Sequence, residues 1–143
     1  QSEGEYDEGN GETEDVLAVI RYAQSANAGL PLALAGFSFG AFVQTRAAEV
    51  LTAAGESIAH LMLTGMPAGA LSDTLSYDTP TVPAHALVVH GERDERVPLV
   101  NVFDWARPQE LPVVVVPGAG HFFTGKLPGL RRVVESYLRR PAE

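Results

Sequence analysis

The chain has 143 residues, 45% of them hydrophobic, no cysteine and a net charge of −8. The apolar content is enough for the core of one domain, and no apolar run approaches the roughly 18 residues that a membrane span needs. The absence of cysteine excludes disulfides, thiolate metal sites and a cysteine nucleophile, while the acidic balance argues against a nucleic-acid partner. We therefore predict one domain over residues 1–143 that binds neither nucleic acid nor a membrane. We expect the protein to be cytoplasmic, although the lack of cysteine does not itself place it in a compartment.

The N-terminal segment differs in composition from the rest of the chain. The first fifteen residues carry seven acidic side chains and no basic one. We interpret residues 1–12 as a solvated acidic leader. Because the chain begins with Gln1 rather than Met, we interpret this terminus as a cut end.

Four short apolar segments, each followed by glycine or proline, are typical of strands buried on both faces of a parallel sheet. In chain order they are 31–35, 58–64, 86–90 and 112–116. Helical patterns alternate with them at 13–28, 39–54, 97–106 and 127–139. This alternation predicts an α/β fold with a parallel sheet flanked by helices. Residues 65–83 have no strong period, and we expect a loop there with at most one helical turn.

A glycine-serine-glycine pattern lies between the first predicted strand and the helix that follows it. The motif is Gly36-Phe37-Ser38-Phe39-Gly40, the G-x-S-x-G of a nucleophile elbow, a tight turn that presents the serine hydroxyl above the sheet. We expect both glycines to be required because a Cβ at either position would collide with the neighbouring strand and helix. The helix N-terminus behind the serine is suited to bind a developing oxyanion.

A serine hydroxyl needs a base to take its proton, and the base needs an acid to orient it. In this arrangement both should follow later strands, with the acid before the histidine. Asp94 lies after the third predicted strand and His121 after the fourth, so the order Ser38, Asp94, His121 is met. Glu92 and Glu95 share the loop with Asp94 and are alternatives for the acid, although the spacing from the strand end favours Asp94.

The remaining candidate groups have structural interpretations. We expect His60, His85 and His90 to be structural, with His90 a satisfied core histidine, and Arg93 and Arg96 to be solvated or ion-paired. The four histidines lack the spacing of metal ligands, and no loop matches a calcium site. The sequence therefore predicts hydrolysis with no cofactor and no metal.

With these residues in place, the chain resembles the α/β-hydrolases, and more narrowly the small bacterial members that have little or no cap. The resemblance rests on SEGEYDEGNGETED, LALAGFSFGA, LVVHGERDERVP and VVPGAGHFFTGKL, which together span nearly the whole chain. It implies that Ser38 is the nucleophile, Asp94 the acid and His121 the base. It also implies that the Phe39 N–H is one oxyanion donor.

The expected activity is that of an esterase-type serine hydrolase acting on small acyl esters, with Phe37, Phe39, Phe122 and Phe123 around the mouth of the site. The same triad supports thioesterase, amidase and perhydrolase chemistry, so these remain open. A non-catalytic scaffold or interaction protein on the same fold is the alternative from another class.

The chain departs from the resemblance at its front. Hydrolases of this fold have further strands before the elbow strand, and these have no counterpart here. We therefore expect the C-terminal portion of a larger hydrolase, in which the outer edge of the elbow strand is open. We expect that edge to be covered by a preceding N-terminal segment or by self-association.

Overall fold

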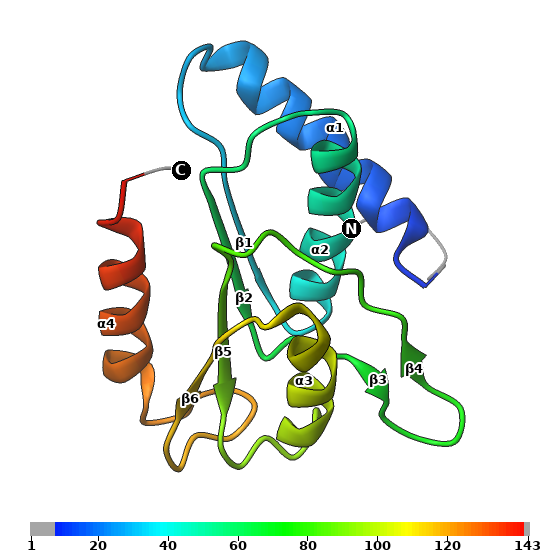
Figure 1. Ribbon diagram of the computed structural model, residues 1–143, viewed down its shortest axis with the longest axis vertical. Helices are drawn as coiled ribbons and strands as arrows, with labels where there is room; N and C mark the ends of the chain where they lie inside the picture. Colours follow the sequence, from blue (N-terminus) through cyan, green and yellow to red (C-terminus); the bar gives the residue numbers. More distant parts are fainter. Residues whose placement is uncertain (1–7, 142–143) are drawn as a thin grey trace.

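A computed structural model describes residues 8–141 of the chain and shows a parallel sheet of four strands at its centre (Figure 1). The strands are β1 (Ala33–Phe37), β2 (His60–Thr64), β5 (Leu87–Gly91) and β6 (Val113–Val116), and their order across the sheet is β1-β2-β5-β6. Leu34 is in register with Leu61, and Val88 with Val113. The predicted α/β fold is confirmed.

Helices cover both faces of this sheet. They are α1 (Asn10–Ala26), α2 (Phe39–Ala53), α3 (Leu99–Ala106) and α4 (Leu127–Leu138), with a short 3₁₀-helix, η1 (Arg107–Gln109), after α3. The main core lies between the sheet and α1, α2 and α3, whereas α4 lies against the opposite face (Figure 1). Within residues 8–141, no helix is both long and apolar enough to cross a membrane.

Element boundaries differ from the expectations by up to three residues. The first helix begins at Asn10 rather than at residue 13, because Gly9 adopts φ 91° and its carbonyl accepts the Thr13 N–H at 3.0 Å. Residues 10–12 of the predicted leader therefore belong to α1. The leader's first seven residues lie outside the described part of the chain.

The segment 65–83 contains a small hairpin, which corrects the expectation of a loop with at most one helical turn. Strands β3 (Gly69–Ala70) and β4 (Ser76–Tyr77) pair antiparallel. The hairpin is held to α3 by the Asn101 side chain, whose Nδ2 donates to the Ala68 and Ala70 carbonyls at 2.9 and 2.8 Å. Such side-chain to backbone bonds are tertiary contacts, so local periodicity carries no sign of them.

Strand β1 lies at an edge of the sheet. Within residues 8–141 it pairs with β2 alone. The Ser38 N–H donates to the Thr64 carbonyl across this pair at 2.9 Å. The N–H and C=O groups of successive residues in a strand point to alternate sides. Those of Ala33, Ala35 and Phe37 therefore point away from β2. This side carries no strand in the described chain.

We expect the 143-residue chain to self-associate through β1, because unpaired strand N–H and C=O groups are a template for another strand. Replacing Ala35 with proline removes one outward N–H and leaves the bonds to β2 in place. The expected result is a shift from dimers or larger species to monomer, measured by sedimentation velocity over a range of concentrations. Ala35→Val keeps the N–H and should associate as the parent chain does. A parent chain that is monomeric at every concentration would contradict this prediction.

Candidate active site

Ser38 occupies the sharp turn that joins β1 to α2. Its φ of 54° and ψ of −128° belong to a backbone region that residues with a side chain rarely adopt. Gly36 permits this turn, since a Cβ there would lie 2.5 Å from both the Gly40 carbonyl oxygen and the Ala41 Cα. At Gly40 an added Cβ would meet no described atom within 4 Å apart from its chain neighbours and the backbone of its own helix, so the expected collision with a neighbouring element is wrong there.

The turn brings Ser38 to the edge of the sheet at which Asp94 and His121 also lie. Asp94 is in the loop after β5, and His121 is in the loop after β6. Because all four strands are parallel, their carboxyl ends meet at one edge, and the three side chains converge there.

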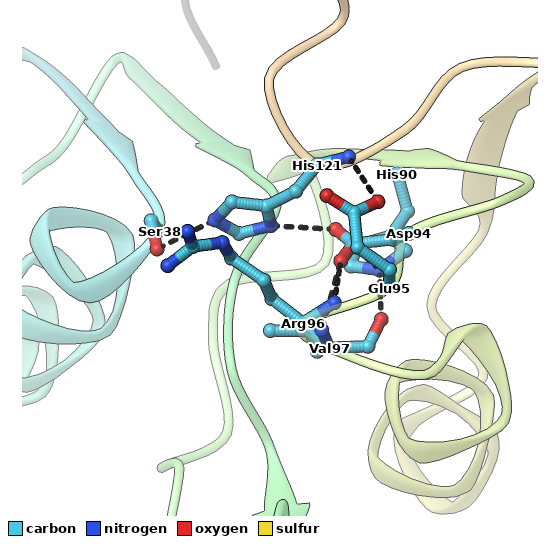
Figure 2. Close-up of polar contacts among 7 residues, drawn as sticks. All are labelled: Ser38, His90, Asp94, Glu95, Arg96, Val97 and His121. Atoms are coloured by element: carbon cyan, nitrogen blue, oxygen red, sulfur yellow. Dashed lines mark hydrogen bonds and ion pairs between the residues drawn. The ribbon is translucent and has the colours of Figure 1, made fainter.

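A continuous chain of hydrogen bonds joins the three side chains (Figure 2). His121 Nε2 lies 2.9 Å from Ser38 Oγ, and His121 Nδ1 lies 2.8 Å from Asp94 Oδ2. A carboxylate accepts, so Nδ1 carries the proton and Nε2 is left to accept the serine hydroxyl. This is the tautomer that a general base acting on Ser38 requires.

The Asp94 carboxylate is buried and is held by the backbone on its other side. Its Oδ1 accepts the N–H groups of Arg96 and Val97 at 2.9 and 2.8 Å. Only 8% of Asp94 and 2% of His121 are exposed. Two backbone donors and one imidazole donor therefore fix the orientation of the carboxylate and stabilise its charge.

The two neighbouring glutamates hold the histidine loop through its backbone. Glu92 Oε2 accepts the Gly118 N–H at 2.6 Å, and Glu95 Oε2 accepts the His121 N–H at 3.3 Å. The carboxylate that contacts the imidazole ring is that of Asp94. This geometry favours Asp94 over both alternatives for the acid.

His90 lies closer to the site than the sequence analysis indicated. It is fully buried, and its Nε2 lies 2.9 Å from the Val97 carbonyl oxygen and 3.4 Å from Asp94 Oδ2. Its Nδ1 is buried with no hydrogen-bond partner among the described residues, so the expectation of a satisfied core histidine holds for one ring nitrogen only. The sign of this contact in the sequence was the position of His90, four residues before Asp94 at the end of the strand.

The other two histidines lie away from the site. His60 contacts the ring of Tyr137, and His85 bonds to the Ile58 carbonyl.

Two of the predicted mouth aromatics lie beside the imidazole. The ring centroids of Phe37 and Phe122 each lie 5.1 Å from that of His121, and the two residues are 43% and 55% exposed. Phe123 is a correction: it is 1% exposed and packs in a core cluster with Val89, because its φ of 53° turns the chain after Phe122. It therefore does not border the site.

Phe39 contributes to the site through its place in α2. It is the first residue of that helix, directly after Ser38, so its N–H lies at the helix N-terminus. Its ring faces Phe42, with 6.2 Å between the ring centroids. The N-terminal end of a helix carries partial positive charge, which is suited to stabilise an anion near Ser38 Oγ.

A serine on a strand-to-helix elbow, followed by an acid and a histidine after later parallel strands, defines the architecture of the α/β-hydrolases. The chain has the α/β-hydrolase fold. A scan against protein-family models gives no match, and a search among curated proteins gives none either.

Solved structures with the same architecture match almost the whole chain. One is a serine hydrolase without a lid from Xanthomonas campestris, with 34% identity and a TM-score of 0.81 over 98% of this chain and 61% of the other. A serine hydrolase homologue from Coxiella burnetii has 34% identity and a TM-score of 0.73 over 93% and 61% of the two chains. An α/β-hydrolase-like protein of unknown function from Agrobacterium tumefaciens has 26% identity and a TM-score of 0.81 over 98% and 64%. The chain thus spans less than two thirds of the length of each of these three proteins.

Proposed function

We propose that this chain carries the catalytic triad of a serine hydrolase that cleaves small acyl esters, with Ser38 as nucleophile, His121 as base and Asp94 as the orienting acid. The observation that carries the proposal is the unbroken hydrogen-bond chain from Asp94 through His121 to Ser38. The similarity to serine hydrolases at 34% identity supports it.

The reaction proceeds in two halves. Ser38 Oγ attacks the ester carbonyl carbon while His121 Nε2 takes the hydroxyl proton, and the carbonyl oxygen becomes an oxyanion that the Phe39 N–H binds. Nε2 then gives its proton to the leaving alkoxide, which departs as the alcohol and leaves an acyl group on Ser38. In the second half Nε2 takes a proton from water, whose oxygen attacks the acyl carbon, and returns that proton to Ser38 as the acid leaves.

The aromatic surroundings favour a small acyl group. Phe37 and Phe122 leave apolar surface exposed beside the imidazole, where a short acyl chain can contact it. We expect acetyl and butyryl 4-nitrophenyl esters to be cleaved faster than long-chain ones. A preference for long-chain esters would count against this substrate class.

The first test of the proposal is labelling with a fluorophosphonate, which forms an adduct with an activated serine. Intact-mass spectrometry should show one adduct on the parent chain and none on Ser38→Ala. Ester hydrolysis by the parent chain should disappear in the same variant. A folded parent chain that forms no adduct and cleaves no ester would contradict the proposal and favour a scaffold protein. An adduct without ester cleavage would redirect the search to thioesters and amides.

A further inference from the structure

A cationic side chain lies beside the triad on an aromatic ring. The Cζ atom of Arg96 is 5.0 Å from the centroid of the Phe122 ring, and that ring is 5.1 Å from the His121 ring. In Figure 2 the Arg96 side chain extends from its loop in the direction of Ser38. The guanidinium is thus one aromatic ring away from the imidazole that activates the serine.

The position of this guanidinium is coupled to the triad through the backbone. The Arg96 N–H donates to Asp94 Oδ1 at 2.9 Å, so the carboxylate that orients His121 also holds the main chain of Arg96. The face of Phe122 then supports the planar guanidinium by cation–π attraction, which reduces the freedom lost when the side chain binds a partner. A cation held in this way at the mouth of a site is prepared to bind an anion.

The charge of Arg96 is not neutralised by a carboxylate in the described chain. Within residues 8–141, four contacts within 4.0 Å join a basic or histidine side chain to a carboxylate, and none includes Arg96. The nearby carboxylates of Glu92 and Glu95 accept backbone N–H groups of the histidine loop. By contrast, the exposed Arg131 pairs with Glu135 at 2.6 Å. We expected Arg96 to be solvated or ion-paired, and within these residues it is exposed and has no ion pair.

We propose that Arg96 binds an anionic group, a carboxylate or a phosphate, on the substrate whose ester carbonyl lies at Ser38. This inference rests on the proposed function and adds a substrate class to it. A guanidinium can donate two parallel hydrogen bonds to such a group. The net charge of −8 repels anions from the molecule as a whole. Because salt screens that repulsion beyond about 8 Å, a preference for anions has to come from a local cation.

Matched substrates that differ only in charge test this role. On the acyl side, 4-nitrophenyl hemisuccinate and hemiglutarate are compared with their methyl esters; on the alcohol side, 4-acetoxybenzoate is compared with its methyl ester. In at least one series the parent chain should give a higher kcat/KM for the charged member. The ratio of charged to neutral kcat/KM should fall about tenfold in Arg96→Gln, as expected for loss of a partly exposed charge-assisted hydrogen bond.

Arg93→Gln is the matched control, since it removes the same charge from the same loop on the other side of Asp94. This variant should keep the ratio of the parent chain. An unchanged ratio in Arg96→Gln, or an equal fall in Arg93→Gln, would overturn the proposal.

A binding measurement separates this inference from the proposed function. Calorimetry with Ser38→Ala should show binding of the charged half-ester, about tenfold weaker after Arg96→Gln is added and unchanged after Arg93→Gln is added. If neutral esters are cleaved but Arg96→Gln does not change the cleavage of the charged esters, the hydrolase function stands and the anionic substrate class is wrong. If binding of the charged half-ester depends on Arg96 but no ester is turned over, the anionic ligand class stands and the hydrolase function is wrong. Charged half-ester binding that Arg96→Gln leaves unchanged, or no binding at all, would overturn the inference whatever the turnover.

Discussion

Replacing Asp94 with asparagine is expected to lower kcat for ester hydrolysis about 10⁴-fold, which is the typical cost of presenting the wrong histidine tautomer to a serine. The structure fixes which way the asparagine would face. Two backbone N–H groups, from Arg96 and Val97, donate to Oδ1, so the amide oxygen has to occupy that side. Its NH₂ group then meets His121 Nδ1, which is forced to accept, and the proton moves to Nε2. The base that should take the Ser38 proton is thereby blocked.

The measurement is kcat with a short-chain 4-nitrophenyl ester, together with thermal unfolding to show that the variant is folded. Glu95→Gln is the matched control, because its amide oxygen can still accept the His121 N–H that Glu95 accepts at 3.3 Å. We expect this control to keep kcat within about threefold, since the amide oxygen retains this part-buried hydrogen bond and a neutral acceptor weakens it by only about 1 kcal/mol. An Asp94→Asn variant with kcat within tenfold of the parent would refute the role of Asp94.

Substitution of Gly36 by alanine is expected to destabilise the fold by about 3 kcal/mol, at the upper end of the cost of overpacking. The added Cβ would lie 2.5 Å from two atoms and 2.6 Å from a third, all of them backbone atoms at the start of α2. A side chain could move aside, but helix backbone can yield only by displacing α2 from the sheet. Because Ser38 lies between Gly36 and α2, the same displacement should abolish phosphonate labelling.

Gly40→Ala provides the comparison within the same motif. Apart from its chain neighbours and the backbone of α2 itself, no described atom lies within 4 Å of a Cβ at Gly40. Because Gly40 is inside α2, alanine should be neutral or stabilising by up to about 1 kcal/mol. Urea unfolding of both variants measures the difference. A Gly36→Ala variant as stable as Gly40→Ala would contradict the close packing of Gly36 against the backbone of α2.

The parts of the fold that could be predicted are those encoded by local patterns. The four strands are short apolar segments ended by glycine or proline, and each lies within two residues of its expected position. Asp94 and His121 could be predicted because a nucleophile elbow is followed along the chain by an acid and then a histidine at later strand ends, and strand ends in a parallel sheet share one edge. The convergence of the three side chains follows from that topology.

The parts that could not be predicted depend on tertiary contacts or on single backbone angles. Phe122 and Phe123 are identical in type, and only the turn at Phe123 sends one ring to the imidazole and the other into the core. Gly36 and Gly40 are equivalent in the motif, but only Gly36 faces the backbone of a neighbouring element. The spacing of His90 four residues before Asp94 was the one sign of their contact in the sequence, and the contact itself depends on how the loop after β5 folds back.

Because the triad extends across the sheet, the reactivity of Ser38 depends on the correct assembly of all four strands. Ser38 follows β1 and His121 follows β6, the outermost strands of the described sheet, and their contact joins residues 83 positions apart in sequence. That contact forms only when β2 and β5 lie between them in register. Segment 65–83 also divides the triad, with Ser38 before it and the other two members after it. A polypeptide severed in that segment would hold a nucleophile on one fragment and its activating pair on the other, and the two would regain reactivity only by recombining.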